Sequence, residues 1–155
     1  MRALVDTNVL LDYFARREPY FKWWPNLCAM QEFGDIELWV APQSFADMFY
    51  ILRKQVSAHS LQHAFNESLE FLNVCNVGPA EVAEATRRCW SDYEDCLVAL
   101  CAENIDADVL LSRDASGFKD AKTPVLSLDE LFHMLEEDYG LVYEEIDFEE
   151  EIRHS

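Results

Sequence analysis

Apolar residues recur along this chain with two different periods, and the change of period marks the elements that the sequence predicts. Residues 3–5 form a short apolar run, residues 6–8 are polar, and apolar positions then resume at helical spacing in residues 9–14. This pattern predicts a buried strand, a carboxylate at its C-terminal end and a helix that begins at once. In open α/β sheets ligands bind at the carboxyl ends of the strands. Asp6 is therefore a candidate for an acidic, metal-binding site, although Asp6 or Thr7 is equally suited to cap the helix.

The same change of period repeats through the chain as far as residue 137. Further strands are expected at residues 36–40, 74–77, 108–111 and 125–126. Further helices are expected at residues 21–34, 45–54, 57–72, 82–90, 92–101 and 128–137. Strands that alternate with helices indicate βα units, which build a mostly parallel sheet covered by helices on both faces. The sequence thus predicts an α/β fold with four or five strands.

The composition is that of a single globular domain. The chain has 155 residues, half of them hydrophobic and 13% aromatic, and its apolar runs are too short for a transmembrane helix. Because the first strand is expected from residue 3, we expect no signal peptide. Five cysteines form no CxxC pair and have no histidine at ligand spacing, which favours buried thiols in a reducing compartment. We expect a cytoplasmic protein without a membrane partner.

The net charge of −18 is unevenly distributed along the chain. Residues 129–155 carry eleven acidic residues and a single arginine. We expect a domain at residues 1–135 followed by an acidic C-terminal tail at residues 136–155. Such a tail is typically a solvated end. Apolar residues are interleaved with its acids, however, so the tail can also pack on the domain or on a second subunit. If it packed near the candidate site at Asp6, it would block access to that site.

Acidic residues stand at four places that the predicted topology brings to one edge of the sheet. Asp6 and Asp114 follow strands, Asp47 lies in the first turns after the second strand, and Asp92 and Asp95 begin a helix. Each also has a purely structural interpretation. Residues 44–47 and 91–94 have the spacing of capping boxes, which would make Glu94 structural. Asp92 is favoured at a helix start by the helix dipole, and Asp114 suits a turn.

Taken together, these acids indicate a metal site. Carboxylates that lie close together repel one another unless a cation neutralises them. Hard cations such as Mg²⁺ take oxygen ligands, whereas zinc would require histidine or thiolate ligands that are missing at suitable spacing. The reaction that such a site performs best is cleavage of a phosphodiester by metal-activated water.

The residues named so far resemble the motifs of the PIN-domain nucleases, the family of the VapC-like toxin ribonucleases. The resemblance rests on residues 4–12, on residues 92–95 with Ala99 and Ala102, and on residues 108–114 with Phe118. Their order and spacing agree over residues 1–135. The resemblance implies a three-layer α/β/α fold and an endoribonuclease that depends on Mg²⁺ or Mn²⁺. It further implies an RNA substrate, the role of toxin in a toxin–antitoxin pair, an antitoxin protein as partner and a homodimer.

Carried over by position, the resemblance assigns most of the acids. Asp6 matches the first metal-binding acid, Asp95 the third and Asp114 the fourth, while Asp92 matches an auxiliary acid. The family's second acid is usually a glutamate. Here the matching position is Asp47, whose shorter side chain would reach a metal only through water.

Three further residues are expected to support these acids. Asn8 matches a position that orients the first acid, and Ser112 falls where the family has a hydroxyl near the site. Arg113 stands beside the fourth acid and is our candidate for binding substrate phosphate, although a simple surface ion pair is the more common role of an arginine at such a place.

Two other functions are open on the sequence. Aspartate-nucleophile phosphohydrolases also place an aspartate after a strand, but they need a second aspartate two residues later, where this chain has Asn8. A PIN-like fold that acts mainly as a binding or dimerisation module fits the shortened second acid, the negative charge and the aromatic helix around Trp23 and Trp24.

Overall fold

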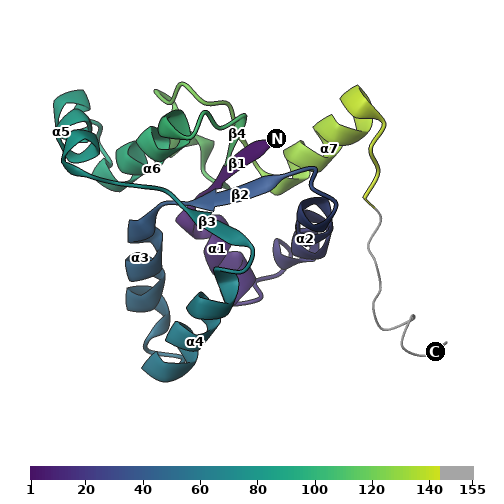
Figure 1. Ribbon diagram of the computed structural model, residues 1–155, viewed down its shortest axis with the longest axis horizontal. Coiled ribbons are helices and arrows are strands. Elements are labelled where there is room, and N and C mark those ends of the chain that lie inside the picture. Colours follow the sequence, from purple (N-terminus) through teal and green to yellow (C-terminus); the bar gives the residue numbers. More distant parts are fainter. Residues whose placement is uncertain (144–155) are drawn as a thin grey trace.

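The computed structural model describes residues 1–143, in which five strands form one parallel sheet in the order β3-β2-β1-β4-β5 (Figure 1). The strands are β1 (Arg2–Val5), β2 (Glu37–Val40), β3 (Leu72–Val74), β4 (Val109–Leu111) and β5 (Val125–Leu126). The helices are α1 (Thr7–Phe14), α2 (Trp24–Glu32), α3 (Pro42–Leu52), α4 (Ala58–Ser68), α5 (Pro79–Arg88), α6 (Tyr93–Asn104) and α7 (Leu128–Tyr139). Two short 3₁₀ helices, η1 (Phe21–Trp23) and η2 (Ala115–Phe118), complete the described chain.

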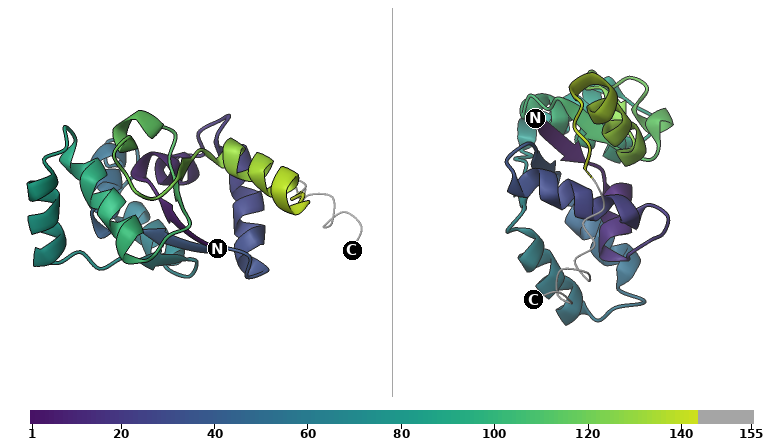
Figure 2. Two further views of the ribbon diagram at one scale, coloured as in Figure 1. Left: turned by 90° about the horizontal axis from the view of Figure 1, so that it is seen from above. Right: turned by 90° about the vertical axis from the view of Figure 1, so that its right-hand side faces the viewer.

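The central strand β1 shows how the helices are distributed over the sheet. Ala3 and Val5 point to one face and belong to the core formed with α1, α2, α3, α4 and α7. Leu4 points to the other face and packs with α6 and Phe118. Helix α5 packs against α6 through Ala85. In Figures 1 and 2 it lies at the opposite end of the molecule from α2 and α7. The prediction of an α/β/α sandwich with a parallel sheet is therefore confirmed.

The predicted strands agree with the observed ones except for the third. The sequence placed it at residues 74–77, but β3 covers Leu72–Val74 and pairs with β2 through Leu72 and Leu38. The prediction was wrong because Leu72 continues the apolar spacing of the preceding helix. In the structure α4 ends at Ser68, and the buried side chain of Leu72 faces the core from the strand instead.

The last described residues return to the amino-terminal edge of the sheet. Helix α7 ends at Tyr139 and is capped by Gly140, whose φ of 65° is the left-handed conformation that glycine adopts easily. Tyr143 then donates its hydroxyl to Asp35 at 2.7 Å, and its carbonyl accepts from Asn26 at 2.8 Å. Asp35 precedes β2, so residues 141–143 lie at the edge opposite Asp6. The rest of the predicted acidic tail, residues 144–155, is outside the described residues.

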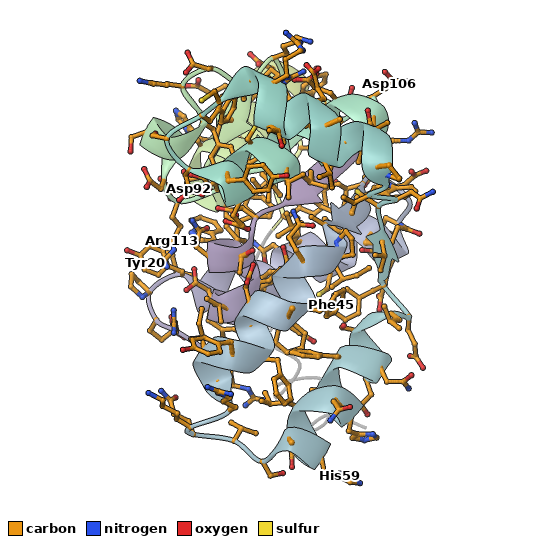
Figure 3. The ribbon with its side chains drawn as sticks, turned by 90° about the vertical axis from the view of Figure 1, so that its left-hand side faces the viewer. Tyr20, Phe45, His59, Asp92, Asp106 and Arg113 are labelled. Atoms are coloured by element: carbon orange, nitrogen blue, oxygen red, sulfur yellow. The ribbon has the colours of Figure 1, made fainter. Side chains whose placement is uncertain are left out.

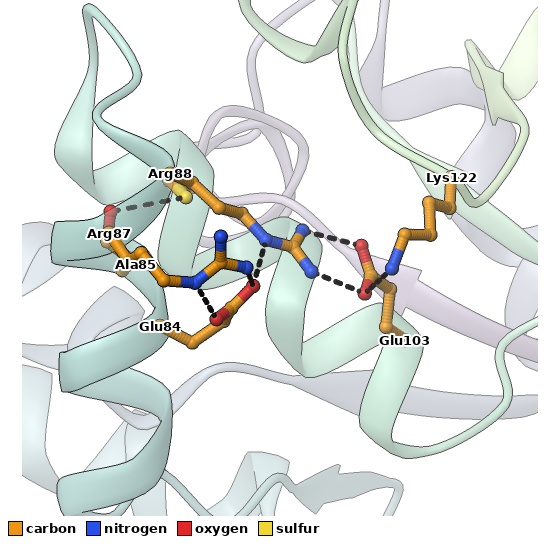
Figure 4. A network of polar contacts seen from close by, with 7 residues as sticks. Glu84, Ala85, Arg87, Arg88, Glu103 and Lys122 are labelled. Carbon is orange, nitrogen blue, oxygen red and sulfur yellow. Dashed lines mark hydrogen bonds and ion pairs between the residues drawn. The ribbon is translucent and has the colours of Figure 1, made fainter.

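A network of charged side chains fixes α5 against α6 (Figure 4). Arg88 donates to Glu84 on its own helix at 2.9 Å and makes two hydrogen bonds of 2.7 and 2.8 Å to Glu103 on α6. Lys122, from the loop before β5, joins Glu103 at 3.0 Å. Both Arg88 and Glu103 are largely buried, and bidentate pairs of this kind are the strong ones. The network therefore holds the helix whose first turn carries Glu94 and Asp95.

Candidate active site

Asp6 stands at the carboxyl end of the central strand with both carboxylate oxygens held in place. Its amide donates to the carbonyl of Leu111 at 2.9 Å, which continues the β1–β4 pairing by one residue. The amide of Thr7 donates to Asp6 Oδ1 at 2.7 Å, and the hydroxyl of Ser112 donates to Oδ2 at 2.8 Å. The side chain is only 3% exposed. Asp6 therefore caps α1, as one interpretation of the sequence required, and also presents a fixed carboxylate at the sheet edge.

Asn8 supports this arrangement through Ser112. Its amide group donates to Ser112 Oγ at 3.2 Å, and the Asp114 amide donates to the same oxygen at 3.1 Å. With two donors directed at its oxygen, the Ser112 hydroxyl is left to point its hydrogen at Asp6. The side-chain oxygen Oδ1 of Asn8 accepts from the backbone amide of Arg113 at 3.3 Å. Asn8 thus acts on Asp6 indirectly, as a brace between α1 and the end of β4.

Glu94 and Asp95 reach the same place from the first turn of α6. The N-cap of this helix is Asp92, whose carboxylate accepts from the amides of Glu94 at 2.9 Å and Asp95 at 3.2 Å. The capping box predicted for residues 91–94 is therefore wrong, because the helix begins one residue later than that pattern needs. Released from capping, the Glu94 side chain turns toward the sheet, where the Thr7 hydroxyl lies 3.2 Å from Glu94 Oε1.

Asp6, Glu94 and Asp95 form a carboxylate trio. One oxygen atom from each of the three side chains lies within 4.8 Å of the others, and within residues 1–143 this is the group whose ligand atoms are close enough to hold one metal ion. The trio joins the end of β1 to the start of α6, two elements that pack directly on each other. Glu94 is the member that sequence reasoning missed, since a local capping pattern explained it.

The trio is electrostatically strained in the absence of a cation. Burial raises the pKa of Glu94 to about 7, and the nearby charge of Asp6 adds to the effect. Burial also raises the pKa of Asp95 to about 6, with Asp92 and Asp6 as further causes. The pKa of Asp6 is raised by burial against the opposing hydrogen bonds from Ser112 and Thr7. Clustered carboxylates with raised pKa values are typical of functional sites, and a bound cation would relieve the repulsion.

Gly117 makes room for the Asp95 carboxylate. A Cβ atom built on this residue of η2 would collide with Asp95 Oδ2 and lie 3.2 Å from its Cγ. The backbone of η2 therefore approaches the trio as closely as only glycine permits. The sequence contains a signal for this contact, a glycine three residues after Asp114, but only the fold shows what it faces.

The other predicted acids surround the trio without joining it. Asp114 is exposed and caps η2 by accepting from the Ser116 hydroxyl and the Ser116 amide, and these hydrogen bonds lower its pKa. Its charge helps to raise the pKa values of Asp6 and Asp95. Asp92 is also exposed. Asp47 is half-buried on α3, and burial raises its pKa.

Asp47 does not form the capping box that its spacing with Ser44 suggested. Helix α3 begins at Pro42 with Ala41 as its N-cap, so Ser44 already lies inside the helix. The Ser44 side chain is buried and lies 2.8 Å from the Thr7 hydroxyl. Ser44 therefore links α3 to the threonine that contacts Glu94, and Asp47 remains at the margin of the site.

Arg113 lies beside the trio but is engaged with its own partners. Its Nε is 3.1 Å from Asp12 Oδ2, and its guanidinium carbon lies 4.3 Å from the centre of the Tyr20 ring. In Figure 3 the labelled side chains of Arg113 and Tyr20 lie together, below Asp92. These contacts tie the end of β4 to α1 and to the segment before η1. Asp12 closes the motif of residues 4–12, and the sequence assigned it no role.

None of the helices described within residues 1–143 has the length and apolarity needed to cross a membrane.

Comparison with known proteins gives one family and a set of related folds. The family model described as PIN domain matches residues 2–116. The crystal structure of VapBC2 from Rickettsia felis bound to a DNA fragment from its promoter has a TM-score of 0.63 at 15% identity, covering 82% of this chain and 98% of that one. VapBC-1 from nontypeable Haemophilus influenzae has a TM-score of 0.64 at 15% identity, covering 83% and 99%.

A toxin–antitoxin complex from Klebsiella pneumoniae has a TM-score of 0.55 at 20% identity, covering 81% of this chain and 97% of that one. At these identities the likeness concerns the fold. No curated protein matches the chain.

Proposed function

Because the chain belongs to the PIN-domain family, whose members are nucleases, we propose that it is an endoribonuclease that cleaves RNA with the help of Mg²⁺ or Mn²⁺. The observation that carries the proposal is the carboxylate trio of Asp6, Glu94 and Asp95 at the carboxyl edge of the sheet. This edge is where catalysis is expected in an open α/β fold.

The residues of the trio fit a hard divalent cation. Their donor atoms are all carboxylate oxygens, the ligands that Mg²⁺ and Mn²⁺ prefer, and histidine or thiolate ligands for a softer metal are missing from the cluster. Raised pKa values in all three side chains mean that the folded protein stabilises them poorly as bare anions. When bound, the cation would lower the pKa of an attacking water and stabilise charge on the leaving oxygen.

The surrounding residues orient the trio. Ser112 and the Thr7 amide fix the two oxygens of Asp6, and the Thr7 hydroxyl contacts Glu94. Second-shell hydrogen bonds of this kind position metal ligands and tune their basicity. Asp114, ionised and exposed at the margin, adds negative charge that favours a cation and is free to act through water. In this proposal Glu94 takes the place expected of the second acid, and Asp47 acts at longer range.

RNA must reach this site against a net charge of −18. Polyanions bind proteins mainly through cationic groups, so a divalent cation on the trio would convert the most repulsive part of the edge into an attractive one. Arg113 supplies a fixed positive group beside it. We therefore propose that RNA binding, and not only cleavage, depends on the divalent cation.

We further propose that the chain is the toxin of a toxin–antitoxin pair, acting in the cytoplasm, with an antitoxin protein as partner and a second copy as dimer mate. The support is the family together with the fold shared with VapBC complexes. Expression of the chain alone in a bacterial host should arrest growth, and co-expression of the small protein encoded next to it should restore growth. Growth arrest that is absent, or that Asp6→Asn leaves unchanged, would contradict the toxin role.

Cleavage itself is tested with purified protein and a labelled single-stranded RNA. Wild type should cleave the RNA with Mn²⁺ and lose the activity in EDTA, while Asp6→Asn and Asp95→Asn should reduce the rate by at least about a hundredfold. Asp106→Asn is the matched control, because Asp106 is an exposed aspartate after the C-terminus of α6, whereas Glu94 and Asp95 lie in its first turn. In Figure 3 Asp106 lies well away from Asp92, the N-cap of that helix. Equal cleavage by wild type and the two site variants would sink the assignment.

A further inference from the structure

Two cavities join into one groove where α1 ends against α4. The first has a volume of about 400 Å³ and lies between the end of α1, the end of α3 and the first half of α4. The second, of about 360 Å³, lies between the end of α1, η1 and the second half of α4. Both are lined by Phe14, Arg16 and Ala64, so they form one continuous surface, called the α1–α4 groove below.

The α1–α4 groove leaves apolar side chains open to solvent. Val56 in its wall is 39% exposed, and Phe14, Phe21 and Phe71 are only partly buried. Exposed apolar surface that is gathered in a hollow marks an interaction site more often than single exposed residues do. The groove therefore suits an occupant that brings apolar side chains of its own.

The same groove is a cationic region of a strongly acidic protein. The chain has 30 acidic and 12 basic residues, yet residues 48–66 contain Arg53 and Lys54 and no acidic residue. These two cations directly follow Leu52 in the groove wall, and Arg16 lies where the two cavities meet. Within the described part of the chain, no carboxylate forms an ion pair with any of the three. Their charge is therefore available to an occupant.

The acidic residues near the groove do not cancel this charge. Glu67 lines the second cavity, and His63 on the same helix lies 3.4 Å from its carboxylate. A comparable hollow of about 370 Å³ beside α7 differs in charge, because Asp129 and Glu136 line it. A segment that is both acidic and apolar is therefore attracted to the α1–α4 groove and repelled by the hollow beside α7.

We propose that residues 144–155 of the same chain bind in the α1–α4 groove. Six of these twelve residues are acidic and one is basic, and the apolar ones among them are Ile146, Phe148 and Ile152. Their acids complement the unpaired cations of the groove, and their apolar side chains complement its walls. This combination of opposite charge and shared apolarity selects the groove as their binding site.

The last described residue lies close enough for this segment to reach the groove. The carbonyl of Tyr143 accepts from Asn26 on α2 at 2.8 Å. On the same helix the ring of Trp24 lies 4.7 Å from that of Tyr13, which lines the groove. Twelve extended residues span up to about 40 Å, more than the roughly 30 Å diameter of a small domain. Attachment to the same chain also gives the segment a high effective concentration, which favours it over the tail of a second copy.

The groove lies at the opposite end of α1 from the carboxylate trio. Asp6 caps the start of α1 and Phe14 ends it, and a helix of eight residues is about 12 Å long. In Figure 3 the start of α4, marked by His59, lies far from Asp92. A tail bound in the groove therefore leaves the trio open. The inference is independent of the proposed ribonuclease function.

Photo-crosslinking of the full chain tests the proposal. The photoreactive amino acid benzoylphenylalanine takes the place of Phe148, the protein is illuminated in dilute solution, and the crosslinked peptides are identified by mass spectrometry. Crosslinks should join position 148 to residues 13–21 or 52–71 of the same chain, which contain the groove wall.

Charge-reversed variants test the basis of recognition. Arg16→Glu combined with Lys54→Glu reverses two exposed charges, which should leave the circular dichroism spectrum unchanged and lower the crosslinking yield by at least about threefold. Lys119→Glu is the matched control, because Lys119 is exposed and follows Phe118, which packs on the other face of the sheet. Its yield should equal that of wild type.

Three results would overturn the proposal. Crosslinks that join two copies of the chain, seen as a dimer in denaturing electrophoresis, would show that the occupant is a second copy. The absence of crosslinks to the groove wall, or crosslinks to the hollow beside α7 instead, would show that the segment does not bind in the groove. A yield that the double variant leaves unchanged would show that the cations of the groove do not recognise the tail.

Discussion

Replacing Glu94 by glutamine should stabilise the metal-free protein at neutral pH and at the same time remove its response to divalent cations. Glutamine has the shape of glutamate and keeps an acceptor for the Thr7 hydroxyl, which lies 3.2 Å from Glu94 Oε1. What it removes is the charge. Burial, followed by the charge of Asp6, raises the pKa of Glu94 from its ordinary 4.5 to about 7, which means that the folded chain disfavours the ionised form.

The sign of the effect follows from this pKa. In the unfolded chain Glu94 loses its proton near its ordinary pKa of 4.5, whereas in the folded chain it does so near 7. Stability therefore falls as the pH rises through this interval, and the whole penalty is present above it. One pKa unit corresponds to about 1.36 kcal/mol, which gives roughly 3 kcal/mol, and the partial exposure of the side chain reduces this to about 2 kcal/mol. Asp95, with its pKa raised to about 6, adds a penalty of the same sign.

Thermal unfolding in EDTA measures the effect. At pH 8, Glu94→Gln should unfold about 4–8 °C above wild type, and at pH 4 the two should unfold at nearly the same temperature. Mn²⁺ should raise the unfolding temperature of wild type but not of the variant. The matched control is Glu84→Gln, since Arg87 and Arg88 lower the pKa of Glu84 to about 2, so its variant should lose stability above pH 4.5. A Glu94→Gln protein that is less stable than wild type at pH 8 would refute the reasoning.

Three further substitutions test other parts of the account. Gly117→Ala places a Cβ against the Asp95 carboxylate, so the Mn²⁺ affinity measured by calorimetry should fall by about tenfold or more. The circular dichroism spectrum should stay unchanged. An unaltered affinity would show that η2 does not confine Asp95. Ser112→Ala removes the hydrogen bond that lowers the pKa of Asp6, and calorimetry should show about tenfold weaker Mn²⁺ binding. Mn²⁺ binding as tight as in wild type would exclude a role for the Ser112 hydroxyl. Arg88→Met removes the largely buried ion pair with Glu103 and should lower the free energy of unfolding, measured in urea, by about 2 kcal/mol. The loss is limited because Lys122 still pairs with Glu103, and an unchanged free energy of unfolding would mean that the network does not fix α6.

Local patterns predicted the fold because the strands differ from the helices in the spacing of apolar residues. The apolar run of residues 3–5 ends at the polar residues 6–8 and becomes β1, and the short apolar run of residues 125–126 becomes β5. The bounds of the third strand were missed because Leu72 fits the apolar spacing of a helix and of a strand equally well. Which pattern prevails is decided by its contact with Leu38 across the sheet.

The site could be predicted only as far as single residues stand at the ends of elements. Asp6 ends a strand and Asp95 begins a helix, so both were found from the sequence. Glu94 was missed because a helix start shifted by one residue changes a capping side chain into a member of the trio. Asp12 and Gly117 act through contacts with residues about a hundred and about twenty positions away along the chain, and no local pattern contains those contacts.

The central claim is that Asp6, Glu94 and Asp95 together hold the cation, and that Asp47 does not. Calorimetric titration of Mn²⁺ into metal-free wild type, Glu94→Gln and Asp47→Asn compares the two candidates for the second acid with substitutions that each remove one charge. We predict saturable binding by wild type, loss of binding by Glu94→Gln and at most about a threefold weaker affinity for Asp47→Asn. Loss of binding in Asp47→Asn with Glu94→Gln unchanged would contradict the assignment.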